Sequence, residues 1–96
     1  MPAYVIFDIH VDDPDAYAPY REPAGKTVAA HGGRYLARGG AHEGLEGDWD
    51  VDRLVILEFP SMEQARAWYE SAEYQEVAPI RHAASRARGV LVEGVG

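Results

Sequence analysis

The sequence predicts an α+β fold in which two β-α-β units form one domain of 96 residues. Three observations predict it. Apolar stretches with extended character occur at 4–11 and 53–59, a helix-start signal follows each, and further extended stretches occur at 34–38 and 89–93. This order, βαββαβ, is the ferredoxin-like split β-α-β arrangement, and we expect a four-stranded antiparallel sheet in the order 4-1-3-2. Helices on one side of the sheet leave the other side in need of a cover.

The first strand has two different faces. Alternate residues of a strand point to opposite sides of the sheet. One set is wholly apolar and suits a face packed under helices: Val5, Phe7, Ile9 and Val11. The other set becomes more polar along the strand: Tyr4, Ile6, Asp8 and His10. This second face is typical of a half-covered cleft.

The first helix has clear start signals, with Asp13 as the N-cap and Pro14 at the first helical position. Pro19 and Pro23 each remove a backbone donor, so we expect a kinked or divided helix that ends near the glycines at 32–33.

The second helix is predicted by the capping-box spacing of Ser61 and Gln64. A single apolar stripe follows and is expected in the core: Ala65, Trp68, Tyr69 and Ala72. Two short helical pieces, 73–78 and 80–85, should then lead to the last strand.

A glycine-rich, acidic stretch at 39–50 is predicted to be a loop between the second and third strands. It matches no dinucleotide-binding, calcium-binding, zinc-binding or phosphate-binding pattern. Loops of this length in compact domains are often functional. We expect it to act as a flap over the open sheet face, with Trp49 as its apolar anchor.

The composition excludes several classes of protein. The formal charge of −7, from 16 acidic and 9 basic residues, argues against nucleic acid or an anionic membrane as a partner. The chain has no cysteine, so disulfides and thiolate metal sites are excluded. No apolar run approaches the ~20 residues that span a bilayer, and no signal peptide is visible. We therefore expect a cytoplasmic protein with a single domain, residues 1–96.

No catalytic motif is present, and the four histidines show no metal-ligand spacing, so neither a metal site nor a cofactor is predicted. One constellation remains. The end of the first strand, with Asp8 and His10, should lie beside the start of the third, with Arg53. If Arg53 shares the open face, the three could bind a carboxylate or enolate, with His10 as a general base. An Asp8–Arg53 ion pair alone is the competing interpretation, and because 53–59 is apolar on both faces, the side that Arg53 faces stays open.

Five further residues are candidates for contacts with a small-molecule substrate: Tyr20, Arg38, Trp49, Tyr74 and Arg81. Arg38 and Arg53 would anchor an anion. Tyr20 shares a helix face with Tyr17, and these two tyrosines either pack in the core or extend a hydroxyl to a ligand.

Characteristic fragments are spread over the whole chain: AHGGRYLARGG (30–40), LEG (45–47), RLVILEFP (53–60), AWYES (67–71), EYQ (73–75), Arg81 and VEG (92–94). With these fragments, the chain resembles the bacterial domain-of-unknown-function family numbered thirteen-thirty, within the dimeric α/β-barrel superfamily. The resemblance implies a homodimer whose two sheets face one another and form a barrel. It implies no established activity. Members of the superfamily include cofactor-independent monooxygenases acting on aromatic polyketides, muconolactone isomerase, haem-binding proteins and small stress-response proteins.

Two hypotheses from different classes follow. In the first, the protein binds or transforms a small aromatic or carboxylated molecule in a pocket at the open sheet face, inside the barrel, or between sheet and helices. In the second, it is a non-catalytic homodimeric assembly or binding module whose sheet face is filled by the partner subunit. Haem binding through His31 or His82 is a third option.

Overall fold

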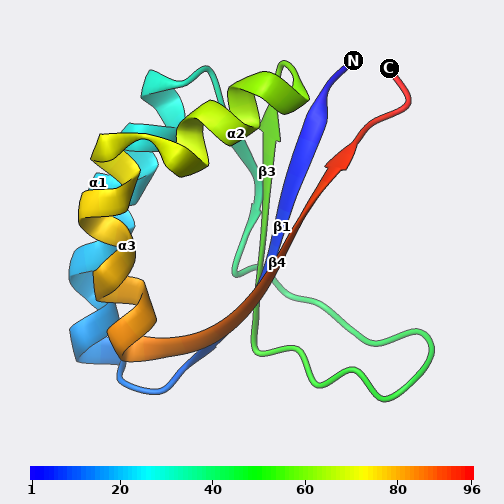
Figure 1. Cartoon of the computed structure of the whole chain (residues 1–96). Helices are drawn as coiled ribbons and strands as arrows, with labels where there is room; N and C mark the ends of the chain where they lie inside the picture. The colour runs from blue at the N-terminus through cyan, green and yellow to red at the C-terminus, as the bar shows by residue number, and fades with distance from the viewer.

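A four-stranded antiparallel sheet is covered on one face by three helices (Figure 1). The computed structural model describes residues 1–96. Its elements are β1 (Ala3–Val11), α1 (Pro14–Ala30), β2 (Arg34–Arg38), β3 (Arg53–Phe59), α2 (Met62–Glu70), α3 (Ala72–Ala84) and β4 (Ser85–Glu93). The sheet order β2-β3-β1-β4 is the predicted order read from the opposite edge, so the predicted fold class is confirmed. None of the helices has the length and apolar character needed to cross a membrane.

The pairing of β1 with β4 brings the two ends of the chain together. Ala3 pairs with Glu93 and Val11 with Ser85, so the pairing spans the whole of both strands. The N- and C-termini accordingly lie side by side in Figure 1. The last strand begins at Ser85, four residues earlier than the sequence predicts, because it extends along the full length of β1.

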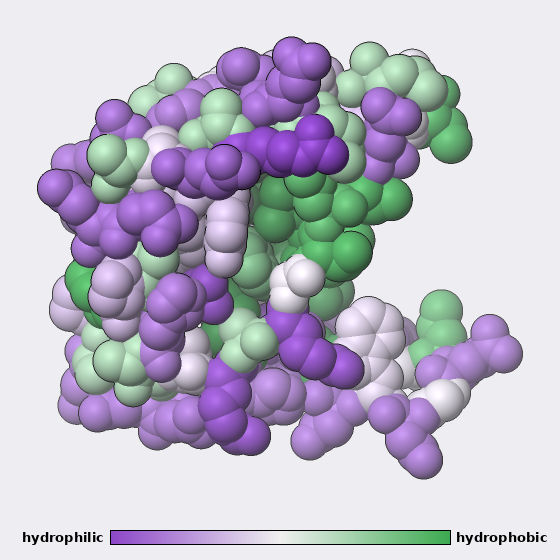
Figure 2. Space-filling model, viewed as in Figure 1, coloured by the Kyte–Doolittle hydropathy of each residue, from purple (hydrophilic) through white to green (hydrophobic).

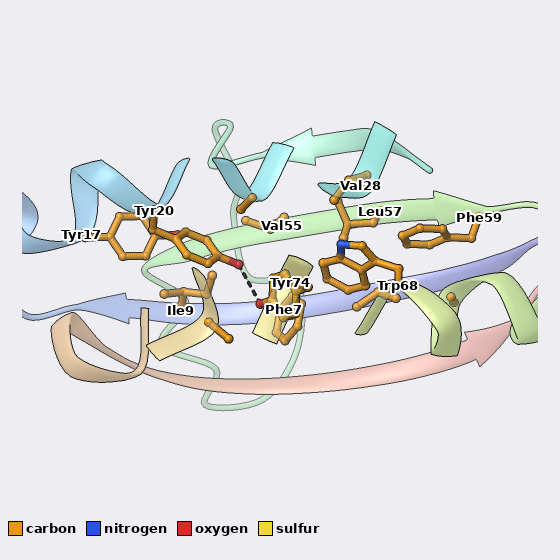
Figure 3. Close-up of a cluster of buried hydrophobic side chains, with 14 of the residues drawn as sticks. Phe7, Ile9, Tyr17, Tyr20, Val28, Val55, Leu57, Phe59, Trp68 and Tyr74 are labelled. Carbon is orange, nitrogen blue, oxygen red and sulfur yellow. Dashed lines mark hydrogen bonds between the residues drawn. The ribbon is translucent and has the colours of Figure 1, made fainter. Parts of the chain in front are cut away.

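The core lies between the sheet and the helices (Figure 3). The predicted apolar set of β1 is confirmed there, and from β3 the core receives Val55, Leu57 and Phe59. The helices contribute large aromatic side chains to the same layer: Tyr17, Tyr20, Trp68 and Tyr74. Tyr69, expected in the core with Trp68, is instead 42% exposed.

The expected break in the first helix does not occur. α1 runs without interruption from Pro14 to Ala30, with Pro19 and Pro23 inside it. Its buried residues recur at helical spacing, namely Tyr17, Tyr20, Ala24, Thr27 and Val28. Packing of this continuous face against the sheet outweighs the two missing backbone donors.

The expected division of the third helix is also wrong, since α3 is continuous through Pro79. The other break that the sequence predicts, at Ser71 before the 73–78 piece, is confirmed. The Ser71 hydroxyl donates to the Trp68 carbonyl at the end of α2 and accepts from the Tyr74 backbone N–H at the start of α3. One side chain therefore ends one helix and begins the next.

The second face of the sheet carries no helix. Strand pairing aligns its apolar residues in neighbouring rows: Tyr4, Ile6, Leu54, Ile56, Val90 and Val92. Val90 and Val92 are exposed, as is Leu36 in β2. Figure 2 shows hydrophobic residues gathered on this side of the molecule, above the loop. The uncovered face inferred from the sequence is thus present and largely apolar.

Candidate functional site

A cavity of about 510 Å³ lies between α2, α3 and the β1–β4 pair. Phe7, Trp68 and Tyr69 supply its aromatic walls, and Arg81 and His82 are among its polar groups. The sequence left the pocket open between two places, the open sheet face and the space between sheet and helices. This cavity lies on the helix-covered side.

Small residues on β4 leave room for the cavity. Ala87 and Gly89 pair with Ile9 and Phe7, which places them on the helix-facing side of the sheet. A Cβ at Gly89 would lie 2.5 Å from Cε1 of Phe7, so the ring of Phe7 occupies the space beside that backbone. Because β4 is an edge strand with small residues on this side, the space between it and the helices stays unfilled.

Arg81 is the buried charge of the cavity. It is 5% exposed, and no carboxylate lies within 4.0 Å of its guanidinium. Its Cζ lies 4.9 Å from the centre of the Phe7 ring, and Nη2 donates to Nε2 of His82 at 3.3 Å. Its Nε has no hydrogen-bond partner. An arginine stays protonated, so a positive charge without a counter-ion faces the cavity.

Tyr20 and Tyr74 form a hydrogen-bonded pair in the protein interior. Their hydroxyl oxygens are 2.8 Å apart (Figure 3). Burial raises the pKa of Tyr20 well above its usual value, and the neighbouring Tyr74 adds to this increase. The two tyrosines raise the pKa of Arg81, and Tyr20, with its raised pKa, adds no negative charge that would compensate the guanidinium. Three predicted site residues, Tyr20, Tyr74 and Arg81, are therefore brought together.

Trp68 forms a rigid wall of the cavity. Its ring centre lies 4.3 Å from that of Tyr74 and 5.4 Å from that of Phe59. The indole N–H donates to Oγ1 of Thr27 at 2.9 Å, and that hydroxyl donates to the Ala24 carbonyl. With its only donor satisfied, the indole presents an apolar surface to any molecule in the cavity.

The two histidines considered for haem lie in different places. His82 lines the cavity beside Arg81, whereas His31 is at the C-terminal end of α1, where Nδ1 contacts the Thr27 carbonyl at 3.0 Å. Only His82 could therefore present a nitrogen to a group bound in this cavity. No three side chains of His, Cys, Asp or Glu are gathered as a metal site would require.

A polar cluster occupies one end of the open sheet face. Asp8 is buried, and its Oδ2 accepts from Nε1 of Trp49 at 3.0 Å and from Nη2 of Arg88 at 3.1 Å. The Trp49 hydrogen bond, followed by the interaction with Arg88, lowers the pKa of Asp8 and outweighs the opposing effect of burial. His10 lies next to it, with Nε2 at 3.8 Å from Oδ1 of Asp8. The sequence correctly placed Asp8 and His10 together on this face.

The third member of the expected trio is elsewhere. Arg53 pairs with Ile9 across the β1–β3 ladder, so it faces the helices, while Leu54 pairs with Asp8. Arg88 of β4, which pairs directly with Asp8, takes the place beside Asp8 and His10 that Arg53 would fill on the open face. A shift of one residue along a strand moves a side chain to the opposite face, and apolar residues on both faces of β3 concealed this parity.

Arg53 instead joins Arg38 and Tyr20 in a small hollow between α1 and the β2–β3 pair. Arg21 of α1 and Tyr35 of β2 complete the polar part of its lining. Two of the predicted anion-binding residues are thus neighbours, although both lie on the opposite face of the sheet from His10.

The 39–52 loop is attached to the sheet by polar contacts. Trp49 is 53% exposed, so the predicted apolar anchor holds the loop through its indole N–H rather than by burial. Oδ2 of Asp52 accepts from the Val11 backbone N–H at 3.2 Å. His42 bridges the loop, with Nδ1 3.0 Å from the Gly40 carbonyl and Nε2 3.0 Å from the Val51 carbonyl. Since a carbonyl only accepts, both contacts are hydrogen bonds only when the imidazole is protonated.

Several features of these sites were not found from the sequence. Ala87 and Gly89 gave no signal, because the cavity they create appears only once β4 is aligned on β1. The sequence suggests His82 only as a haem ligand, and it gives no role to Arg21. The helical spacing of Arg21 from Tyr17, at i and i+4, was a usable signal.

The chain matches a family model, Domain of unknown function (DUF1330), over residues 2–95. It belongs to this family. No curated protein matches it.

Solved structures share the whole fold. A protein of unknown function from Rhodopseudomonas palustris, RPA0582, is 23% identical with a TM-score of 0.79, over 99% of this chain and 83% of its own. SnoaB from Streptomyces nogalater, a cofactor-independent oxygenase, is 13% identical with a TM-score of 0.59, and the match covers 99% of this chain and 92% of SnoaB. A candidate antibiotic biosynthesis monooxygenase from Nitrosomonas europaea is 17% identical with a TM-score of 0.57, over all of both chains. At these identities the likeness establishes the fold of the DUF1330 protein.

The His42 bridge predicts a pH-dependent loop. Hydrogen bonds to the carbonyls of Gly40, first, and Val51 raise the pKa of His42 above 6.5. The bridge should therefore be complete below pH 6.5 and be lost as the pH rises through the raised value. In a ¹H–¹⁵N NMR titration, the indole signal of Trp49 should shift with a midpoint above 6.5. His42→Gln should abolish this transition, and the same transition in that variant would contradict the prediction.

Proposed function

We propose that this protein binds a small molecule with a planar aromatic body and one anionic group in the cavity between α2, α3 and the β1–β4 pair. The observation that carries the proposal is Arg81, a buried guanidinium with no acidic partner and an unpaired Nε, in the wall of that cavity. A buried charge of this kind is costly unless it is paired, and an anionic ligand would supply the counter-charge.

The remainder of the cavity favours an aromatic body. Phe7, Trp68 and Tyr69 form its walls, and the indole N–H of Trp68 is already satisfied by Thr27. A flat apolar ring can pack against these surfaces without leaving a buried donor unpaired. A carboxylate is the simplest anion for Arg81, because its two oxygens match the guanidinium fork.

We further propose that the chain is a homodimer joined through the open sheet face. The apolar rows there, including Ile6, Ile56 and Val92, form an uncovered surface beside the exposed Val90 and Leu36. Exposed apolar patches of this kind mark interaction sites, and a two-fold partner would cover each sheet with the other.

A second candidate function is proton transfer at the open face. It is supported by the approach of His10 to Asp8, 3.8 Å between Nε2 and Oδ1, which would orient the imidazole toward a substrate. Arg88 would take the anion-binding place that the sequence suggested for Arg53. The oxygenase names of two structural relatives support a search for chemistry as well as for binding.

Binding can be tested with 2-naphthoate and its neutral analogue 2-naphthamide, by fluorescence or calorimetry. Arg81→Met should weaken naphthoate about tenfold or more, because a charge-assisted hydrogen bond is lost, and should change naphthamide little. Ala87→Leu fills the cavity from an exposed strand position and should weaken both. Arg86→Met, on the opposite face, is the matched control and should change neither. If neither Arg81→Met nor Ala87→Leu changes the affinity for naphthoate, the cavity is not the binding site, and the assembly module is favoured.

The dimer can be tested by light scattering after size-exclusion chromatography. Val92→Glu places a carboxylate in the apolar interface and should convert the dimer to a folded monomer. Val95→Glu adds the same charge at a fully exposed position and should leave the mass of the wild-type dimer unchanged. A monomeric wild-type protein, or a dimeric Val92→Glu variant, is incompatible with this interface.

Proton transfer can be tested with phenylpyruvate, an enolisable aromatic carboxylate, by following deuterium exchange at its methylene group by NMR. A general base contributes on the order of a hundredfold or more, so His10→Ala should slow the protein-catalysed exchange about a hundredfold. His31→Ala, on the helix side, is the control. Equal exchange rates with wild-type protein and with His10→Ala would rule out His10 as the proton carrier.

A further inference from the structure

Three arginines surround the small hollow on the side of the molecule away from β4. Arg21 comes from α1, Arg38 from the end of β2 and Arg53 from the start of β3. The hollow holds about 20 Å³ and shares only Phe7 and Trp68 with the Arg81 cavity. It is therefore a separate site, and nothing said of it depends on the function proposed above.

None of these three arginines has an acidic partner. The arginines that form ion pairs within 4.0 Å are Arg34, Arg86 and Arg88, which all lie outside this hollow. The chain has 16 acidic residues and a net charge of −7, so acidic side chains are plentiful. Three neighbouring positive charges nevertheless remain uncompensated at this place.

Aromatic rings hold the guanidiniums in position. The Cζ atoms of Arg21 and Arg53 each lie 5.9 Å from the centre of the Tyr17 ring, and Cζ of Arg38 lies 4.2 Å from that of Tyr35. Contact with a ring face stabilises a guanidinium without using its N–H groups. Of all these N–H groups, one is committed within the protein, since Nη2 of Arg38 donates to the Arg21 carbonyl at 2.7 Å. The others remain free to donate to a ligand.

The Arg53 side chain occupies a position that depends on a glycine in the neighbouring backbone. Its side chain crosses Gly39, which has a φ of +70°, and a Cβ at that residue would collide with the guanidinium. The Nε of Arg53 is buried and has no hydrogen-bond partner. A buried donor without an acceptor is costly, so an ordered anion nearby would favour this arrangement.

We propose that Arg21, Arg38 and Arg53 bind a terminal phosphoryl group, carried either by inorganic phosphate or by a phosphorylated small molecule. Three guanidiniums match a dianion with several acceptor oxygens better than a single carboxylate, and the guanidinium fork fits phosphate geometry. The hollow has room for about one water molecule, so the phosphoryl group binds across its mouth, where the guanidiniums lie, and the remainder of the ligand lies outside. The hydroxyl of Tyr35 stays a neutral donor, because burial raises its pKa.

The site can be tested on ¹⁵N-labelled protein by following the arginine Nε–H signals during titration with sodium phosphate, phenyl phosphate or sodium acetate at constant ionic strength. Saturable shifts of the Arg21, Arg38 and Arg53 signals with either phosphate compound are expected, with acetate at least about tenfold weaker. Arg21→Met and Arg38→Met, both at exposed positions, should each weaken phosphate binding about tenfold. Arg34→Met, on the same strand as Arg38 but facing the open side, removes an equal charge and should change the affinity less than twofold.

Tighter binding of phenyl phosphate would assign the site to phosphorylated small molecules, and tighter binding of inorganic phosphate would assign it to the free ion. Both results support phosphoryl recognition. The proposal is overturned if no saturable shift occurs, if acetate binds as tightly as phosphate, or if Arg34→Met weakens binding as much as Arg38→Met does. Arg81→Met should leave phosphate binding intact, which separates this site from the cavity.

Discussion

The pairing register of β1 with its two neighbours determines on which face of the sheet each functional side chain of these strands lies. Because successive residues of a strand point to opposite faces, the register assigns Ile9, Arg53 and Ala87 to the helix side and Asp8, Leu54 and Arg88 to the open side. The aromatic core, the cavity beside β4 and the polar cluster at Asp8 all follow from this assignment. A register change by one residue would exchange the contents of the two faces and remove each site at once.

The two faces of the sheet hold positive charge in different ways. On the open face, Arg86 and Arg88 pair with Asp12 and Asp8, as ordinary ion pairs do. Between sheet and helices, the arginines contact aromatic rings instead, with Arg81 over Phe7 and Arg38 over Tyr35. Rings hold a guanidinium without neutralising it, so these positive charges stay uncompensated in a protein that is acidic as a whole.

The sequence predicts the fold well because each element carries a local signal. The alternation of β1 and the caps at Asp13 and Ser61 depend only on neighbouring residues, and the structure contains each of them. The prolines of α1 and α3 misled the prediction, since tertiary packing outweighs a local loss of backbone donors. Arg53 was unassignable because both faces of β3 are apolar, and the cavity depends on small residues of β4 whose effect arises only from pairing. Long-range geometry, rather than residue type, is what the sequence leaves undetermined.

The contact between Gly89 and Phe7 has a consequence for variation within the family. The Phe7 ring lies against the Gly89 backbone and contacts the Arg81 guanidinium. This one ring therefore limits the depth of the cavity and fixes the position of its positive charge. A side chain at position 89 can be accommodated only if residue 7 becomes smaller, and that replacement would remove the ring that contacts the Arg81 guanidinium. Positions 7 and 89 should therefore change together during evolution. Such paired changes would give related proteins cavities of different shape on an unaltered backbone, and with them different ligands.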